Sequence, residues 1–510
     1  MKKLLTVIWI SATFISCEVA SQKAEEKPLK TVVIIVDALR FDYVNENITP
    51  NIHALIEKGS FGLHHHSTFP TVTRVNSTSY ATGAYPKTHG ILGNSIYLPS
   101  VDPSRGLNTG DAEVMIKADA VENGKLLTSL SIGEVMDKNN LGTYAVFSTG
   151  STGQSFLLNH KVKGMGIINP EMILPSNLEK KVIEEIGEIP PKSKPNKERH
   201  KWITDAYIRY ALNEDIIDVA TIWYSDPDAT AHGAGIGAPL TLESIKNVDE
   251  QIGRIIQAIE SMGLNDRVNV IISADHGFAT HKGNPGISNF LIEKGFKENK
   301  ESSDIVVVGN AIYLAEDQKV NGSEVINALM REEWVGGIFV NPELDLIESI
   351  SGNVFSFEDI HWNHLKRRSD IYVDVNWTDE ENEFGYQGFS YNNGVAGHGS
   401  ASPYEMKTPF VAVGPSFKTG FNNEFPSAMV DLVPTVLHIH GLVDSEFVPD
   451  GRILKELLSS DTEEPNTSWQ KDHITKKMES NDLQYEMEVH TSTIGDFVYL
   501  DYTKVKRLKK

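Results

Sequence analysis

Four short apolar runs, each rich in β-branched residues, constrain the fold of this 510-residue chain more than any other feature. They are residues 31–36, 219–224, 268–273 and 409–413. Longer segments with helical periodicity separate them. The clearest is 241–262, with Thr241 as its expected N-cap. Alternation of buried strands with amphipathic helices predicts βαβ units around a mostly parallel sheet.

Acidic residues come directly after, or a few residues after, three of these runs. They are Asp37, Asp228 and Asp275. Because ligands collect at the carboxyl ends of strands in open α/β sheets, we expect the three carboxylates to converge. A single acid after a strand is more often a turn or N-cap residue. The prediction therefore depends on the whole set and its histidine neighbours.

Three histidines accompany these acids. His232 lies four residues after Asp228, so a helical turn would place both on one face. His276 follows Asp275 directly, and His398 lies between two glycines that permit close backbone approach. Oxygen and imidazole ligands without thiolates suit Zn²⁺ or a similar divalent ion. The set is large enough for two ions that share one substrate.

A hydroxyl group near residue 73 is the expected nucleophile. Thr73, in the run FPTVTRVN, is too basic to attack unaided, but a divalent ion can favour its alkoxide. Local chemistry does not choose between it and the neighbouring hydroxyls of Ser67, Thr68, Thr71, Ser77 and Thr78. Hydroxyl residues at a helix start are also frequent caps.

The charge of the chain limits its partners. Hydrophobic residues make up 40% and charged residues 23% of the sequence, which is typical of a globular protein. The formal net charge of −22 argues against a nucleic-acid duplex as a partner, because binding to its phosphates depends on Lys and Arg. An anionic substrate must therefore be attracted locally, and bound metal ions would supply that field.

The N-terminus is typical of an export signal. Lys2 and Lys3 precede an apolar stretch, 4–15, that is too short to span a bilayer comfortably. The stretch ends at Cys17 and resembles a bacterial lipoprotein signal, with 1–16 removed, 17–30 a linker and Cys17 the lipidated membrane anchor. The protein would then face the periplasm or the cell surface. The alternative is a plain signal peptide. Cys17 is the only cysteine, so an internal disulfide is excluded.

The motifs together resemble the nucleotide pyrophosphatase/phosphodiesterase family, also called type I phosphodiesterases, of the alkaline phosphatase superfamily. The strongest stretch is FPTVTRVNSTSYATGAYPKTHGILGN (69–94). The separations of Asp37 from Thr73, of Thr73 from Asn94 and of Asp228 from Asp275 agree as well. The run VDLVPTVLHIHGL with the later DGR (430–452) also resembles superfamily members. The resemblance covers residues 31–280 and 390–455.

This resemblance implies an alkaline-phosphatase-like three-layer α/β/α sandwich, with an inserted cap region at 281–389 and a C-terminal extension at 456–510.

The resemblance also implies two Zn²⁺ ions. The positions that match ligands of the ion activating the nucleophile are Asp37, Thr73, Asp275 and His276. Those that match ligands of the second ion are Asp228, His232 and His398. Asn94 matches the asparagine that hydrogen bonds a nonbridging phosphoryl oxygen. The implied reaction cleaves phosphodiester or pyrophosphate bonds by double displacement through a phosphothreonine.

One departure from the family affects the substrate. Where the family usually has an aromatic residue after the nucleophile, this chain has Arg74. Arg74 would bind an anionic group, or alternatively point to solvent. Trp202, Tyr207 and Tyr224 are candidates for stacking on a substrate, or else core or rim residues. The expected substrate is a small-molecule phosphate ester or a lipid headgroup.

Three other functions compete with phosphodiester hydrolysis. A phosphomonoesterase of the same superfamily is the nearest, and Arg74 favours it, whereas the PDATAH form of the second motif favours the diesterase. A formylglycine sulfatase is excluded because no cysteine lies near position 73. A lipoprotein that binds a glycan or a partner without catalysis is the remaining alternative.

Overall fold

The computed structural model describes residues 29–139, 142–213, 217–316, 318, 322–344, 354–442, 445–461, 468–479 and 482–509. The expected signal peptide, Cys17 and most of the linker lie outside these residues.

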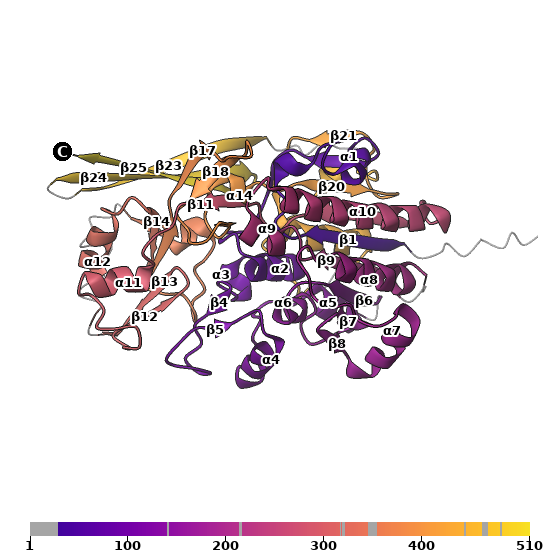
Figure 1. Cartoon of the computed structure of the whole chain (residues 1–510), viewed down its shortest axis with the longest axis horizontal. Helices are drawn as coiled ribbons and strands as arrows, with labels where there is room; N and C mark the ends of the chain where they lie inside the picture. The colour runs from indigo at the N-terminus through magenta and orange to yellow at the C-terminus, as the bar shows by residue number, and fades with distance from the viewer. Residues whose placement is uncertain are drawn as a thin grey trace, which may run out of the picture.

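A nine-stranded sheet forms the centre of the molecule (Figure 1). In spatial order its strands are β21 (Phe421–Asn423), β2 (Ser60–Gly62), β20 (Phe410–Val413), β10 (Val268–Ser273), β1 (Lys30–Val36), β9 (Val219–Tyr224), β6 (Tyr144–Ser148), β7 (Gly166–Asn169) and β8 (Met172–Leu174). Strands β10, β1, β9, β6 and β7 run parallel, while β20 and β8 are antiparallel to their neighbours. The four strands expected from the sequence are present, and the prediction of a mostly parallel sheet is confirmed.

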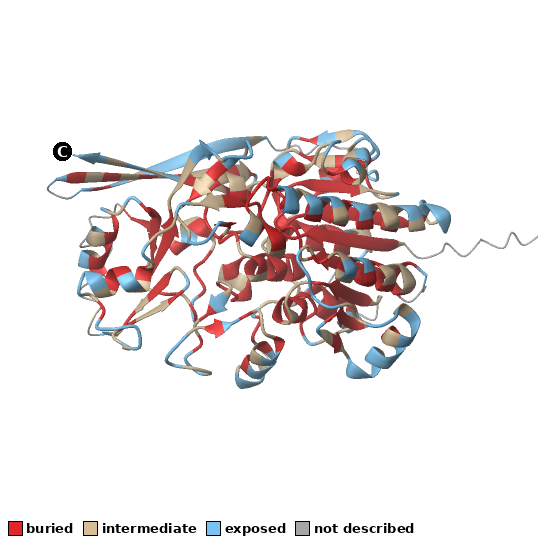
Figure 2. Cartoon of the chain, viewed as in Figure 1, coloured by how far each residue is buried: buried red, intermediate tan, exposed pale blue. Residues whose placement is uncertain are grey.

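Helices cover both faces of this sheet, as the alternation of side chains along β1 requires. Val32, Ile34 and Val36 pack into one core with α8 (Lys197–Tyr207) and α10 (Pro239–Ser261). Val33 and Ile35 pack into another with α2 (Thr73–Thr82), α5 (Ile132–Asn139) and α15 (Leu432–Ile439). Strands β1, β9 and β10 are accordingly buried along their whole length (Figure 2). The predicted three-layer α/β/α sandwich is confirmed.

Helix α10 starts earlier than the sequence analysis predicted. Thr241 is not its N-cap, because Pro239 occupies the first turn and Ala238 is the cap. Proline suits this position, since the first turn needs no donor from it. The Thr241 hydroxyl instead donates to the carbonyl of Gly235 at 2.7 Å.

The segment predicted as an insertion, 281–389, holds most of two further sheets. One has the order β12 (Ile305–Val308), β13 (Ala311–Leu314), β16 (Ile371–Val375), β14 (Val335–Val340) and β15 (Phe355–Ser356). The other has the order β17 (Trp377–Glu381), β18 (Gln387–Ser390), β11 (Ala279–His281) and β19 (Ala396–Gly397). Helices α11 (Ile287–Glu293) and α12 (Gly322–Leu329) accompany the first sheet (Figure 1).

The C-terminal region forms an antiparallel sheet of β23 (Trp469–Glu479), β24 (Leu483–Ile494) and β25 (Phe497–Lys509). Its residues Tyr485, Met487 and Val489 share a hydrophobic core with Ile338 and Phe339 of β14. The sheet is thereby packed against the inserted segment.

Shorter elements complete the described part of the chain. The remaining helices are α1 (Pro50–Ile56), α3 (Pro86–His89), α4 (Ala112–Val121), α6 (Thr152–Leu158), α7 (Glu179–Ile186), α9 (Asp228–Ala234) and α14 (Pro403–Met406). The remaining strands are β3 (His65–His66) with β22 (Ser427–Ala428), and β4 (Ser95–Ile96) with β5 (Leu107–Asn108).

Candidate metal centre and active site

Two buried carboxylates meet where β1 and β10 end side by side. Asp37 follows β1 directly, and Asp275 follows β10 after one residue. The indole N–H of Trp223 donates to Asp37 Oδ2 at 3.0 Å, and the backbone N–H of Ala38 donates to Asp275 Oδ1 at 3.0 Å. In each carboxylate, one oxygen thus accepts a hydrogen bond. The second oxygens, Oδ1 of Asp37 and Oδ2 of Asp275, are buried without a hydrogen-bond partner among the described residues.

A third carboxylate and two imidazoles lie on the β9 side of the site. Asp228 begins α9, and its Oδ1 lies 3.1 Å from Nε2 of His232 and 3.3 Å from Nε2 of His398. His232 is the most exposed of these side chains, at 44%, whereas His398 is 6% exposed. The helical spacing of Asp228 and His232 does place both on one side of α9, as predicted.

His276 connects the two groups of acids. Its ring stacks on His398 with 3.6 Å between ring centroids, and its Nε2 lies 3.2 Å from Asp275 Oδ2 and 3.7 Å from Asp37 Oδ1. The candidate ligand atoms of Asp37, Asp275 and His276 lie within 4.8 Å of one another, as do those of Asp228, His276 and His398.

The hydrogen bonds of the imidazoles fix which nitrogen faces the centre. In each ring Nδ1 contacts a backbone carbonyl: Ala396 for His232, Gly277 for His276 and Thr71 for His398. A carbonyl can only accept, so Nδ1 carries the proton and Nε2 faces the carboxylates. In neutral His276, the lone pair of Nε2 therefore points toward carboxylate oxygens, and the two repel each other. A cation between them would relieve that repulsion, so the residues fit a metal site.

The electrostatics of the site support this reading. Burial, followed by the charges of Asp275 and Asp228, raises the pKa of Asp37 well above its usual value. Burial also raises the pKa of Asp275, to about 7. For Asp228, burial favours the neutral form, but the neighbouring imidazoles of His232 and His398 outweigh it and lower the pKa. Burial, followed by the charge of His398, lowers the pKa of His276. Negative charge is thus costly at Asp37 and Asp275 without a cation.

Thr73 lies at the edge of this cluster. It is the first residue of α2, and its Oγ1 is 3.4 Å from His276 Nε2. The backbone N–H of the next residue, Arg74, donates to Asn94 Oδ1 at 3.2 Å, which leaves the Asn94 NH₂ group free to donate elsewhere. The structure therefore brings Thr73, Asn94 and all six predicted acid and histidine ligands to one place.

Arg74 is turned inward instead of toward bulk solvent. Its Nε is buried without a hydrogen-bond partner among the described residues, and burial lowers the pKa of its guanidinium, whereas the charges of Asp37, Asp228 and Asp275 raise it. The three aromatic candidates behave differently. Trp202, Tyr207 and Tyr224 are at most 4% exposed and belong to the core between the sheet and α8, so they are unavailable for stacking on a substrate.

A family model for type I phosphodiesterase / nucleotide pyrophosphatase matches residues 31–342. The chain belongs to this family. One relative is bis(5'-adenosyl)-triphosphatase ENPP4 of Pongo abelii, which is 23% identical to this chain over 459 residues. The match covers 86% of this chain and 84% of that protein. Ectonucleotide pyrophosphatase/phosphodiesterase family member 7 of Homo sapiens is 23% identical over 429 residues, covering 81% and 80%.

Solved structures of low identity share the fold. Murine ectonucleotide pyrophosphatase/phosphodiesterase 5 has a TM-score of 0.60 and 19% identity, over 84% of this chain and all of that one. Wild-type alkaline phosphatase PafA has a TM-score of 0.60 and 17% identity, over 85% of this chain and 99% of that one. The expected alkaline-phosphatase-like fold is confirmed.

As a type I phosphodiesterase the chain is a hydrolase, and family membership supports phosphodiester hydrolysis. The family and its structural neighbours are metal-dependent, in agreement with the two groups of candidate ligands. In the part of the chain that the structure describes, no helix combines the length and the apolar character needed to cross a membrane.

Sequence reasoning missed the residues that hold the site in place. Trp223 holds Asp37, and Glu405 holds the loop that carries His398. Glu405 Oε2 accepts from Ser400 N at 2.6 Å and from Thr71 Oγ1 at 3.0 Å. Trp223 lies near the end of a predicted strand, a few residues before the predicted ligand Asp228. Its position in the sequence could therefore have indicated a place near the site. The contact of Glu405 with Thr71 joins residues distant in sequence, which no local pattern indicates, whereas Ser400 and Ser402 lie close to it in the chain.

Proposed function

We propose that this chain is a two-metal phosphodiesterase or nucleotide pyrophosphatase that works through a phosphothreonine on Thr73, with Zn²⁺ as the expected metal. The observation that supports this most strongly is the set of three buried carboxylate oxygens that have no hydrogen-bond partner among the described residues. They belong to Asp37, Asp228 and Asp275, and they face imidazole Nε2 atoms within a few ångströms of the Thr73 hydroxyl.

The proposed ligands fall into the two groups implied by the family resemblance. Asp37, Thr73, Asp275 and His276 would hold one ion, and Asp228, His232 and His398 would hold the other. Bound ions of this kind favour the alkoxide of a coordinated hydroxyl and neutralise charge developing on a phosphoryl group. The backbone carbonyls behind the three imidazoles fix their orientation for this task.

Thr73, at the N-terminus of α2, is placed for nucleophilic attack. Its Oγ would form the new bond to phosphorus while the alcohol or phosphate leaving group departs with the electrons of the broken bond. The positive end of the helix dipole favours anionic phosphoryl oxygens at this position. The Asn94 NH₂ group would donate to a nonbridging oxygen. Water would then cleave the phosphothreonine and restore the hydroxyl.

Arg74 would bind an additional anionic oxygen of the substrate. Its Nε is buried without a hydrogen-bond partner among the described residues, and the charges of the acids act on its guanidinium, so metal ions that neutralise those acids would leave Arg74 as a cation able to bind an anion. This observation also favours the second candidate, a phosphomonoesterase, because a monoester carries one more negative charge. The names of two relatives, a bis(5'-adenosyl)-triphosphatase and a murine enzyme solved with AMP, favour nucleotide-type esters.

The proposed location is outside the cytoplasm. Cys17 would be the lipidated first residue of a bacterial lipoprotein, with the catalytic domain tethered through the linker. A Cys17→Ser protein that still fractionates with membranes would contradict this anchor.

The test combines metal analysis with a substrate panel. Purified protein should contain two divalent ions per chain and hydrolyse bis-p-nitrophenyl phosphate faster than p-nitrophenyl phosphate, with activity lost on chelation and restored by Zn²⁺. A preference for p-nitrophenyl phosphate would replace the diesterase with the monoesterase. Active protein without metal would overturn both.

A further inference from the structure

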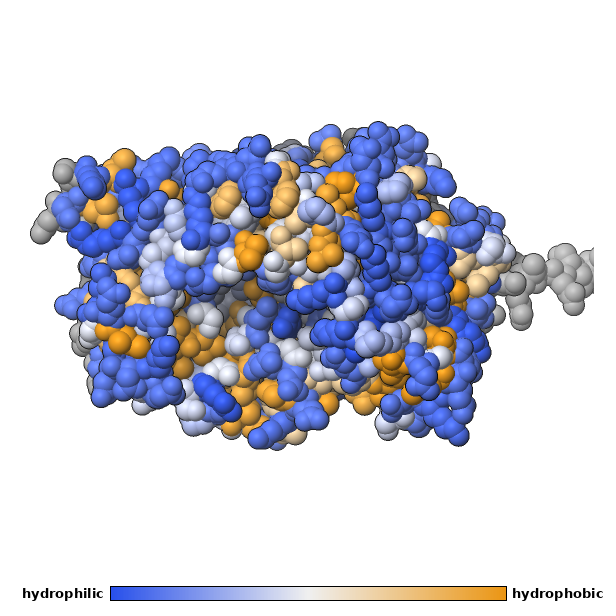
Figure 3. Space-filling view, viewed as in Figure 1, coloured by the Kyte–Doolittle hydropathy of each residue, from blue (hydrophilic) through white to orange (hydrophobic). Residues whose placement is uncertain are grey.

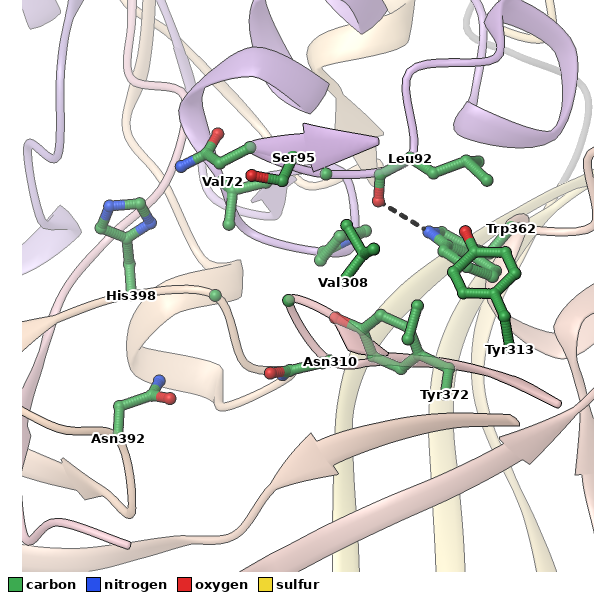
Figure 4. Close-up of a pocket in the computed structure, with 16 residues that line it drawn as sticks. Val72, Leu92, Ser95, Val308, Asn310, Tyr313, Trp362, Tyr372, Asn392 and His398 are labelled. Carbon is green, nitrogen blue, oxygen red and sulfur yellow. Dashed lines mark hydrogen bonds between the residues drawn. The ribbon is translucent and has the colours of Figure 1, made fainter. Parts of the chain in front are cut away.

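Two cavities of similar size open in the described part of the chain. One, of about 190 Å³, has His398 at its edge and belongs to the site already described (Figure 4). The other, of about 180 Å³, lies where the C-terminal sheet meets the main domain, and it shares no lining residue with the first. We call it the junction cavity. The main domain contributes His64, His66 and Lys407, and the C-terminal sheet contributes Lys471, Asp501 and Tyr502.

Two lysines give the junction cavity its charge. Lys407 follows α14 and Lys471 lies on β23, so their side chains come from the two sides of the junction. Neither ammonium group forms an ion pair or a hydrogen bond with another described residue. Acidic residues outnumber Lys and Arg by 69 to 47 in this chain, and the face shown in Figure 3 is largely hydrophilic. Lysines without an acidic partner in such a chain indicate a place for an anion from solution.

Packing holds Lys407 at the cavity. Its Nζ lies 3.9 Å from the ring centroid of Phe41, which itself stacks on Phe61 at 5.7 Å between centroids. An ammonium group has three donors, and contact with one ring leaves donors for a ligand. Burial, followed by the charge of Lys471, lowers the pKa of the half-buried Lys407. An anion between the two lysines would relieve their repulsion.

The acid in the cavity does not neutralise these lysines. Asp501 Oδ1 lies 2.8 Å from His66 Nε2, and Asp501 Oδ2 accepts from Ser492 Oγ at 3.0 Å. The other ring nitrogen of His66, Nδ1, lies 3.0 Å from the carbonyl of Ser427. A carbonyl only accepts, so Nδ1 carries a proton, and Nε2 needs one as well to face a carboxylate. His66 and Asp501 therefore balance each other, and the charge of the two lysines remains.

Neutral groups complete the lining. Burial, followed by the charges of Lys471 and Lys407, lowers the pKa of His64, so its imidazole is neutral near pH 7 and offers one N–H. The ring of Tyr502 stacks on His490 at 4.2 Å between centroids, and its hydroxyl forms no hydrogen bond with another described residue. Both side chains can donate to an anionic oxygen without adding charge.

Charge and size together favour a compact dianion. Two ammonium groups match a species with two negative charges, whereas a monoanion would leave one of them unbalanced. The volume equals roughly six water molecules at about 30 Å³ each, which is room for a tetrahedral oxyanion with a small substituent or a few waters. Such an oxyanion presents several oxygens to donors from different directions, and hydrogen bonds between two charged groups are among the strong ones.

We propose that the junction cavity binds a compact tetrahedral dianion, either inorganic phosphate or a small phosphate monoester, between Lys407 and Lys471. The bound anion joins the C-terminal sheet to the main domain, because the two lysines come from opposite sides of the junction. The inference goes beyond the proposed function and does not depend on it, since the cavity contains none of the proposed metal ligands and not Thr73.

Calorimetry with sulfate tests the site without turnover, because sulfate is a tetrahedral dianion. We expect binding to the metal-loaded protein in a dilute chloride buffer. Lys471→Gln, a change at an exposed side chain that leaves the core intact, should lower the sulfate affinity at least about tenfold, and Lys407→Gln/Lys471→Gln should lose the site. The control Lys418→Gln/Lys504→Gln removes a lysine that lies over the ring of Phe421 and an exposed lysine of β25, and it should stay within about twofold. Sulfate held at the metal centre is common to all these proteins.

Crystals of metal-loaded Thr73→Ala protein soaked in selenate locate the anion. A selenium anomalous peak is expected between Lys407 and Lys471, and it should be absent when both lysines are replaced by glutamine. Phosphate should displace it, and displacement by glycerol 2-phosphate as well would add monoesters to the ligands. Equal sulfate affinity in wild-type and Lys471→Gln protein would overturn the proposal. So would selenate only at other places, or displacement by the monoanion methanesulfonate as readily as by phosphate.

Discussion

Replacing Glu405 with glutamine should disturb the site although Glu405 touches neither substrate nor proposed metal. This buried carboxylate accepts from Ser400 N at 2.6 Å, Thr71 Oγ1 at 3.0 Å, Ser400 Oγ at 2.7 Å and Ser402 Oγ at 3.1 Å. The carbonyl of Thr71 in turn accepts from His398 Nδ1 at 2.7 Å, and its hydroxyl accepts from Gly399 N at 3.0 Å. Glu405 thus fixes the loop that presents His398.

The expected loss in the free energy of unfolding follows from these contacts. In Glu405→Gln an NH₂ group replaces one oxygen, so about two of the four accepted hydrogen bonds are lost at roughly 1.5 kcal/mol or more each. The free energy of unfolding should fall by about 3 kcal/mol. Unfolding entropy of about 2.1 cal/mol/K per residue gives roughly 1 kcal/mol/K for 510 residues, so the melting temperature should fall by about 3 °C.

The assay measures melting temperature and bound metal together. Glu405→Gln should lose part of the metal at the group that contains His398, with the other ion retained. Glu383→Gln, which changes an exposed carboxylate of the inserted segment, is the control. An unchanged melting temperature together with two bound ions in Glu405→Gln would refute the argument that this residue positions His398.

Four further outcomes are expected. Thr73→Ala should lower turnover by at least about 10³-fold while diester binding persists, since it removes the nucleophile and one proposed metal ligand but leaves the acid and histidine ligands in place; retained turnover would contradict the phosphothreonine. Trp223→Phe removes the N–H that holds Asp37 and should weaken metal binding about 10- to 100-fold, measured by chelator competition. Arg74→Ala should lower kcat/KM about tenfold or more for p-nitrophenyl phosphate, and by less for methyl p-nitrophenyl phosphate. The raised pKa of Asp275, about 7, means that protons compete with metal, so the metal affinity of the apoprotein should fall as pH drops below 7; the same affinity at pH 6 and 8 would contradict this.

The main sheet could be predicted because its strands are marked locally. Strands β1, β9 and β10 are short, largely apolar runs, and they alternate along the chain with segments of helical periodicity. The convergence of Asp37, Asp228 and Asp275 follows from parallel pairing of these strands alone. The expected start of α10 at Thr241 is wrong because the proline two residues before it already occupies the first helical turn.

The inserted segment could not be predicted in the same way. Its sheet joins β13 to β16 and β16 to β14, strands separated by long stretches of chain, and its core is completed by the C-terminal sheet. Such pairings depend on tertiary packing that no short window of sequence records.

Anomalous diffraction at the zinc edge from crystals of the metal-loaded protein would locate the proposed ions. We expect two peaks, one bounded by Asp37, Thr73, Asp275 and His276, and the other bounded by Asp228, His232 and His398. A single peak, or peaks away from these side chains, would contradict it.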